Sequence, residues 1–391
     1  MRPVIKADLL RRAITPENDR KPIYGCVMTD DNDALLDAAT ALVPPLLNAL
    51  EALAFAGRHL HPPHLARIAA ALEPFEAPVR EGRARFDAVK WPDDLEFFRS
   101  QLVLSSDAAL RALDGVAQSA TDPNGVMRAF RSMRSSTQAV EALYPLTFIL
   151  PPVSRFFLEP ERRQDDALVR RIADADAMRD DVGILNVDNA RDARGGFSLY
   201  VPEYYDASQR WPLIVALHGG SGHGADFLWS WLREARTRGC IVISPTAQEG
   251  TWSLMNPPLD GDALRTLVGR VAERWSIDTD HVLLTGMSDG GTFSLLTGLL
   301  DRGPFTHLAP ISGSFHPMLL DAASDIRGLP IYLVHGALDW MFPIEMARTA
   351  NAALLAAGAA VTFREIADLS HTYPRDENPR ILDWLLGTPA T

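Results

Sequence analysis

The second half of the chain alternates short apolar runs with longer helical patterns, and this alternation constrains the fold more than any other feature. The apolar runs predict strands over residues 183–187, 196–201, 213–217, 241–244, 282–285, 307–311, 331–334 and 361–366. Helical patterns follow most of these runs, notably over residues 259–275, 292–300, 343–357 and 378–386. Strands that alternate with helices are typical of a mostly parallel sheet with flanking helices. The sequence therefore predicts an α/β fold here.

The first half follows a different pattern. From about residue 33 to residue 177, apolar residues recur at spacings of three and four, which predicts helices. The best-marked helices cover residues 63–72, 93–116, 126–143 and 161–178. We expect Pro44 and Pro45 to kink or divide the helix that contains them. The chain is thus predicted to hold an all-α N-terminal domain (residues 1–180) and a catalytic α/β domain (residues 181–391).

Composition and charge limit the function classes. With 391 residues, 47% hydrophobic residues and a formal charge of -12, the chain fits a globular protein whose acidic surface repels nucleic acid and anionic membranes. The N-terminal 20 residues do not resemble a secretory signal, and no stretch is expected to span a bilayer, which predicts a cytoplasmic protein. Cys26 and Cys240 are the two cysteines, and the apolar surroundings of Cys240 predict a buried free thiol.

Residues 282–291 combine an apolar strand, a GxSxG turn and a helical pattern. Such a turn exposes its serine at the tip of a strained strand-to-helix connection, and Gly286 and Gly290 let the two backbones pass closely. Ser288 is therefore the predicted nucleophile. A plain glycine-rich turn is the alternative interpretation.

Two later strands carry the partners that a serine nucleophile needs. Asp339 follows the strand at residues 331–334 and is the predicted orienting acid, while Asp325 and Glu345 fit solvated or helix-capping roles better. His371 follows the last predicted strand and is the predicted base. The order Ser, Asp, His is the one found when a nucleophile turn is followed by its acid and base on later loops.

Residues 217–224 are rich in glycine and close an apolar strand. Such a loop can turn backbone N–H groups inward, so Gly220 and Asp289 are predicted to donate N–H groups to an oxyanion. The loop lacks the GK[ST] ending of a phosphate-binding loop. Ser221, Trp252 and His316 are candidate residues of the substrate pocket, although Trp252 fits a packing role equally well. His218 and His335, which precede glycines at strand ends, are expected to make structural hydrogen bonds.

Residues 196–386 resemble an α/β-hydrolase, in particular the bacterial serine esterases of the phospholipase/carboxylesterase, polyhydroxybutyrate-depolymerase-like and feruloyl-esterase-like groups. The resemblance is carried by the segments 200–202, 217–220, 277–282 and 286–291, by His335-Gly336 with Asp339, and by His371. It implies the same catalytic and oxyanion residues and no metal or organic cofactor. Asp289 departs from the Gln, Ala or Met of several relatives, and a carboxylate there would disfavour anionic substrates. The helical half matches no family known to us.

The predicted function is therefore hydrolysis of a small or medium neutral ester through an acyl-serine intermediate. A lysophospholipase, a thioesterase or a small peptidase would use the same triad. A binding or scaffold protein with a hydrolase-like half is the alternative of another class. The helical half would form a homo-oligomer, pack against the catalytic half or cap the site.

Overall fold

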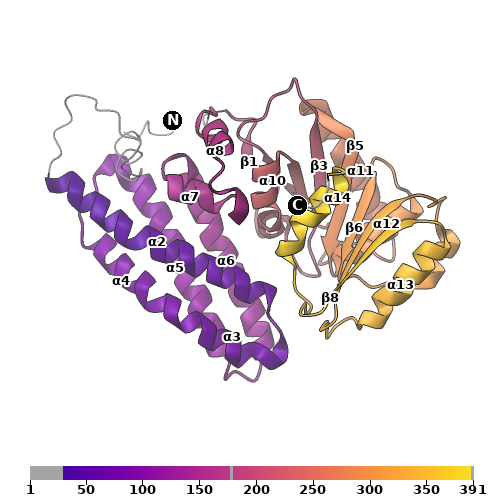
Figure 1. The fold of residues 1–391 in the computed structure, drawn as a ribbon, viewed down its shortest axis with the longest axis horizontal. Coiled ribbons are helices and arrows are strands. Elements are labelled where there is room, and N and C mark those ends of the chain that lie inside the picture. The colour runs from indigo at the N-terminus through magenta and orange to yellow at the C-terminus, as the bar shows by residue number, and fades with distance from the viewer. Residues whose placement is uncertain (1–29, 177–178, 389–391) are drawn as a thin grey trace. The chain divides into compact units, whose positions relative to one another are not determined.

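The computed structural model describes residues 30–176 and 179–388. The chain forms two compact units, Met1–Asp165 and Asp166–Thr391 (Figure 1). Helix α8 (Asp166–Ala173) groups with the second unit. The domain boundary expected at residues 180 and 181 stays a prediction. Cys26 lies outside the described residues.

The described part of the first unit is all-α. Its helices are α2 (Asp30–Arg58), α3 (Leu65–Leu72), α4 (Glu76–Asp87), α5 (Glu96–Ser119), α6 (Gly125–Leu143) and α7 (Pro151–Phe156). α5 and α6 approach closely where a Cβ on Gly115 would lie 2.1 Å from Ser132 Oγ. The helices expected at residues 63–72, 93–116 and 126–143 are confirmed.

Helix α4 was not predicted from the sequence. Its apolar stripe is short, because Val79 and Phe86 are its buried hydrophobic side chains and charged residues fill most other positions. Gly82 lies between them and packs against α2, where a Cβ on it would be 2.4 Å from the Ala41 carbonyl oxygen. This contact depends on the absence of a side chain at Gly82, so it adds no apolar residue to the sequence pattern from which α4 could have been predicted.

We expected Pro44 and Pro45 to kink or divide the first helix, and the division is wrong. α2 runs without interruption through both prolines. Pro45 has no N–H to donate to the Ala41 carbonyl, one turn earlier, and this is the carbonyl that Gly82 approaches. The apolar face of this continuous helix, which includes Leu42 and Leu46, is buried.

α2 also corrects the expectation that no stretch could span a bilayer. Within the described residues, Asn32–Arg58 is the one helix long and apolar enough to cross a membrane, with a mean hydropathy of 1.4. A core helix of a helical bundle has the same length and composition, and the apolar face of α2 is buried. The finding is weak evidence for a membrane segment.

The second unit is built on one mostly parallel sheet. Its strands are β1 (Gly183–Val187), β2 (Phe197–Val201), β3 (Trp211–Leu217), β4 (Ile241–Pro245), β5 (Ile277–Met287), β6 (His307–Ile311), β7 (Pro330–Gly336) and β8 (Ala360–Ile366). They lie in the order β1-β2-β4-β3-β5-β6-β7-β8. β2 is antiparallel to both of its neighbours, and all other neighbours are parallel. Every predicted strand is confirmed.

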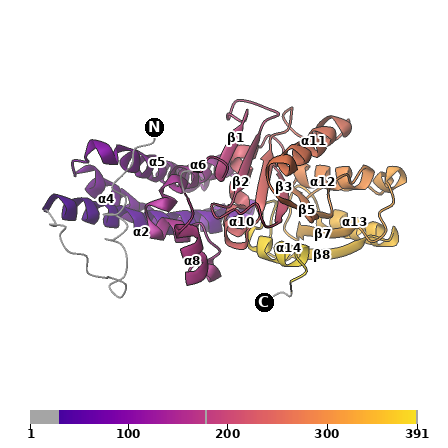
Figure 2. The ribbon, with the colours of Figure 1, turned by 90° about the horizontal axis from the view of Figure 1, so that it is seen from above.

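Helices cover both faces of this sheet. α11 (Pro258–Arg274) and α12 (Asp289–Leu300) lie on one face, and α10 (Leu232–Arg238) and α14 (Asn378–Leu385) lie on the other (Figure 2). α13 (Ile344–Ala356) connects β7 to β8. The predicted fold class is confirmed, and Cys240 is buried and not part of a disulfide, as predicted. Helix α10 was not predicted.

The parallel strands bring their carboxyl ends to one edge of the sheet. β3 pairs with β5 and β7 pairs with β8, all in one direction. The loops that follow these strands therefore meet at that edge, where open α/β sheets form their binding sites.

Candidate active site

Ser288 occupies the turn between β5 and α12 in a strained backbone conformation. Its φ is 56° and its ψ is -120°. A Cβ on Gly286 would lie 2.5 Å from the Gly290 carbonyl oxygen, and a Cβ on Gly290 would lie 2.4 Å from the His218 carbonyl oxygen. Both positions therefore require glycine, and the turn holds Ser288 at the end of the strand.

His371 lies between Ser288 and Asp339. Its Nε2 is 3.0 Å from Ser288 Oγ, and its Nδ1 is 2.8 Å from Asp339 Oδ2. Because the carboxylate only accepts hydrogen bonds, Nδ1 carries the proton and Nε2 is free to accept one from the serine hydroxyl. The structure thus brings the predicted nucleophile, base and acid into one hydrogen-bonded chain.

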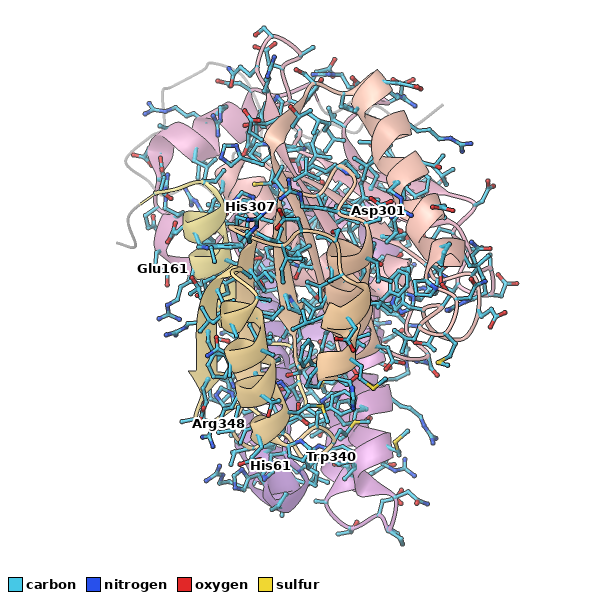
Figure 3. The ribbon with its side chains drawn as sticks, turned by 90° about the vertical axis from the view of Figure 1, so that its right-hand side faces the viewer. His61, Glu161, Asp301, His307, Trp340 and Arg348 are labelled. Atoms are coloured by element: carbon cyan, nitrogen blue, oxygen red, sulfur yellow. The ribbon has the colours of Figure 1, made fainter. Side chains whose placement is uncertain are left out.

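The carboxylate of Asp339 is held in its ionised form. Burial alone would raise its pKa, but hydrogen bonds from His371 and from the Phe342 N–H outweigh burial and lower the pKa below its ordinary value. Its second oxygen, Oδ1, accepts 2.9 Å hydrogen bonds from the N–H groups of Met341 and Phe342. Trp340, next along this loop, is 47% exposed (Figure 3).

His335 contacts the same loop, and the sequence did not indicate which groups of the loop it would contact. Its Nε2 donates to the Phe342 carbonyl at 2.8 Å and lies 3.6 Å from Asp339 Oδ2. The Phe342 ring in turn meets the His371 ring edge-on, with ring centroids 5.3 Å apart. The pair His335-Gly336 at the end of β7 was the sequence signal for a structural hydrogen bond.

The loop after β3 carries Gly220, the first of the two predicted oxyanion donors. His218 Nε2 accepts from the Ala247 N–H at 3.1 Å, so Nδ1 carries the proton and donates to the Gly219 carbonyl at 2.7 Å. Burial lowers the pKa of His218 to about 4, which keeps the ring neutral. In a trans peptide the C=O and the N–H point in opposite directions, so the Gly220 N–H is directed away from His218.

Asp289 offers a second N–H at the start of α12. The first N–H groups of a helix have no partner within the helix. Across the part of the chain that the structure describes, no hydrogen bond from the Gly220 or Asp289 N–H is seen. The role of both groups as oxyanion donors stays a prediction.

The three pocket candidates have different surroundings. Ser221 has a φ of 56° and its N–H donates to the Gly250 carbonyl at 2.9 Å. Trp252 is buried and stacks on Phe293, with ring centroids 5.4 Å apart. His316 is exposed and accepts from the Met318 N–H at 3.2 Å. Their role in a substrate pocket stays a prediction.

Trp252 also lines a hollow of about 530 Å³ together with residues of the β1–β2 connection and α11. Its lining does not include Ser288, Asp339 or His371. The place of Trp252 in a substrate pocket is not decided by this hollow and stays a prediction.

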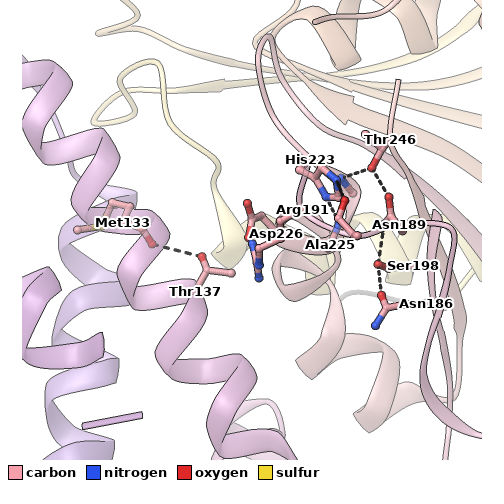
Figure 4. A network of polar contacts seen from close by, with 12 residues as sticks. Met133, Thr137, Asn186, Asn189, Arg191, Ser198, His223, Ala225, Asp226 and Thr246 are labelled. Carbon is pink, nitrogen blue, oxygen red and sulfur yellow. Dashed lines mark hydrogen bonds and ion pairs between the residues drawn. The ribbon is translucent and has the colours of Figure 1, made fainter. Parts of the chain in front are cut away.

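A polar network fixes the far end of the oxyanion loop (Figure 4). His223 caps α9 (Gly224–Phe227) by accepting from the Ala225 N–H at 3.1 Å. The N–H of Gly224, the residue before Ala225, donates to Thr246 Oγ1 at 2.9 Å. From Thr246 the hydrogen bonds continue, at 2.6 to 2.9 Å, through Asn189, Ser198 and Asn186. The loop is thus anchored at both ends.

Within the described residues, no group of three or more His, Cys, Asp or Glu side chains is placed to hold a metal ion.

Comparison with known proteins finds similarity to esterases. Residues 262–385 match the family model described as phospholipase/carboxylesterase. The bifunctional acetylxylan esterase/xylanase XynS20E of Neocallimastix patriciarum is 25% identical over 203 residues, which is 49% of this chain and 28% of that protein. The present chain therefore spans less than a third of the length of that relative.

Two esterases are among the solved structures to which this chain is similar. A thermostable esterase is 20% identical over 53% of this chain and 63% of its own, with a TM-score of 0.44. Esterase PE8 is 20% identical over 50% of this chain and 99% of its own, with a TM-score of 0.41. The family match, taken with the sheet topology, confirms the predicted resemblance to α/β-hydrolase esterases.

Proposed function

We propose that residues 181–391 hydrolyse carboxylic esters through an acyl-serine intermediate at Ser288. One observation carries this proposal, namely the hydrogen-bonded chain from Ser288 Oγ through His371 to Asp339. In that order the histidine can remove the serine proton and the carboxylate can stabilise the imidazolium that forms. The family match supports the same chemistry.

The first half of the reaction forms the acyl-enzyme. Ser288 Oγ attacks the ester carbonyl carbon while its proton passes to His371 Nε2. The carbonyl oxygen becomes an oxyanion that accepts hydrogen bonds from the Gly220 and Asp289 N–H groups. Collapse of this intermediate breaks the bond to the alcohol oxygen, which leaves with the proton from His371.

The second half releases the acid. Water gives a proton to His371 Nε2 and attacks the acyl carbon, and a second oxyanion forms in the same place. Collapse expels Ser288 Oγ, which takes the proton back from His371. The products are a carboxylic acid and the original enzyme.

Small or medium neutral esters are the proposed substrates. The Asp289 carboxylate stands beside the oxyanion donors, where it opposes a negative charge on the substrate. The matched relative is named as an acetylxylan esterase, so acetyl esters of sugars belong in the first substrate panel. Thioesters, lysophospholipids and amides are the competing substrate classes.

A fluorophosphonate probe tests the nucleophile. We expect the native protein to be labelled, Ser288→Ala to remain unlabelled, and Ser208→Ala, a change in a surface turn, to label normally. Equal labelling of the Ser288→Ala variant would refute the nucleophile, and an unlabelled native protein would favour a binding or scaffold role. Rates on p-nitrophenyl esters of increasing chain length, beside a thioester and an aminoacyl amide, test the substrate class.

A further inference from the structure

The segment that follows β4, residues 249–252, contacts the oxyanion hole at several points, and we call it the brace. Thr251 makes the most direct contact, because its Oγ1 donates to Asp289 Oδ2 at 2.6 Å. The same carboxylate oxygen lies against Gly220, where a Cβ would be 2.7 Å away. Thr251 thus fixes the Asp289 side chain against Gly220, and these are the two residues whose N–H groups form the proposed hole.

The neighbours of Thr251 hold the loop that carries Gly220. The Gly250 carbonyl accepts from the Ser221 N–H at 2.9 Å, directly after Gly220. The Trp252 indole N–H donates to the His218 carbonyl at 2.7 Å, two residues before it. Gly220 therefore lies between two hydrogen bonds to the brace.

Arg194 ties the brace to this loop from the side. Its guanidinium donates to the Gly222 carbonyl at 2.8 Å and to the Glu249 carbonyl. A planar guanidinium with fixed donors holds two carbonyl groups in a defined relative position.

The brace itself is held firmly. Just beyond it, Asp260 at the start of α11 is buried and accepts from the Ser253 N–H at 2.8 Å. Just before it, the same carboxylate accepts from the Gln248 N–H at 3.3 Å. One buried side chain therefore fixes both ends of the brace.

We propose that the brace sets the geometry of the oxyanion hole, with Thr251 and Trp252 as positioning residues for acyl transfer. This inference rests on the proposed function. Its physical basis is that oxyanion stabilisation requires N–H groups aimed in advance at the position of the developing charge. Loss of hydrogen bonds from the brace would misplace these N–H groups and weaken binding of the transition state. Ground-state binding of the ester would remain largely intact.

Thr251→Val is the primary test, because valine keeps the shape of threonine and removes the hydroxyl. We expect kcat on a p-nitrophenyl ester to fall about 10- to 100-fold with KM nearly unchanged. Phosphonylation by a fluorophosphonate should slow in parallel, and Thr251→Ser should restore both rates. The matched control is Thr349→Val, which removes a 2.8 Å hydrogen bond to the Glu345 carbonyl on the exposed surface of α13.

Trp252→Phe provides a second variant, since phenylalanine can keep the stacking on Phe293 and lacks the indole N–H. It should also lower kcat more than it changes KM. Amide NMR shifts of Gly220 and Asp289 add a readout that does not need turnover. They should move in Thr251→Val and stay in place in Thr349→Val.

The outcomes separate the two proposals. Turnover that survives in Ser288→Ala would refute the proposed function and leave the amide shifts to decide on the brace. Turnover that requires Ser288, with a normal kcat and unmoved amide shifts in Thr251→Val, would refute the brace. Equal losses of kcat in Thr251→Val and Thr349→Val would also refute it, because the effect would then be one of general stability.

Discussion

At the scale of single residues, the proposed chemistry depends on which nitrogen of His371 carries the proton. Asp339 selects Nδ1 through the 2.8 Å hydrogen bond to Oδ2. In Asp339→Asn, the amide NH₂ can face Nδ1, which moves the proton to Nε2 and blocks the base. We expect kcat to fall about 10³- to 10⁴-fold.

The matched control for this prediction is Asp325→Asn. Asp325 is an exposed carboxylate whose partner is Arg327 on the same loop. Its replacement should leave kcat unchanged. Near-normal turnover of Asp339→Asn, measured on the same p-nitrophenyl ester, would show that another group orients His371.

His218 makes a prediction about stability and pH. Its pKa is lowered to about 4 in the folded protein by burial, and the ordinary value is 6.5. At pH values between 4 and 6.5, His218 is mostly protonated in the unfolded chain and mostly neutral in the folded chain. The free energy of unfolding therefore falls as pH decreases from 6.5 towards 4. The difference between the two pKa values corresponds to a loss of roughly 3 kcal/mol in the free energy of unfolding at the acid end of this range.

Urea unfolding at several pH values between 4 and 7.5 tests this, with His218→Asn as the comparison. Asparagine keeps a donor near the position of Nδ1 and does not titrate. The variant should therefore lose part of the pH dependence of the native protein. An identical slope in both proteins would place the acid sensitivity in other groups.

At the scale of elements, the strands were the most predictable part of the fold. The runs at residues 241–244 and 307–311 are apolar and bounded by turns, because strands buried on both faces need hydrophobic side chains throughout. The order of Ser288, Asp339 and His371 after β5, β7 and β8 followed from the same pattern. The local sequence was sufficient to predict an element wherever burial of that element required a recognisable run of apolar residues.

Features that depend on contacts between distant segments could not be predicted. Nothing in the sequence near Thr251 indicates a hydrogen bond to Asp289, which lies 38 positions away. The continuity of α2 through Pro44 and Pro45 is of the same kind. Pattern gave the candidate nucleophile and its partners, while the brace became visible only from the three-dimensional contacts.

The contact between α4 and α2 can be tested through Gly82. A Cβ at this position would be 2.4 Å from the Ala41 carbonyl oxygen and 2.9 Å from Leu42 Cα, so the helices must separate to accept it. We expect Gly82→Ala to destabilise the protein by about 1 to 3 kcal/mol, despite the better helix propensity of alanine.

Gly269→Ala is the control, because Gly269 lies inside α11 and nothing stands within 4 Å of its Cβ position. This change should be neutral or stabilise by up to about 1 kcal/mol. Denaturant unfolding of the two variants compares them directly. If both variants gain stability, α2 and α4 do not pack as closely as described.

At the scale of the whole molecule, the two compact units differ in what stabilises them. The first is a set of helices packed through apolar faces and small residues such as Gly82 and Gly115. The second has a sheet core and also a fully buried ion pair, in which Arg236 Nε lies 3.0 Å from Glu203 Oε1. Removing one member of a buried ion pair leaves an uncompensated charge in the interior.

These differences predict that the full chain unfolds in two steps, one for each unit, since proteins with separate cores commonly depart from two-state behaviour. Gly82→Ala should lower only the midpoint of the helical unit. Arg236→Met removes the positive charge beside the buried Glu203 carboxylate and should destabilise the second unit by about 3 to 5 kcal/mol. Differential scanning calorimetry of the full-length variants measures both effects, with the loss of esterase turnover on heating identifying the transition of the second unit. A single transition moved by both substitutions would mean that the two units unfold as one cooperative body.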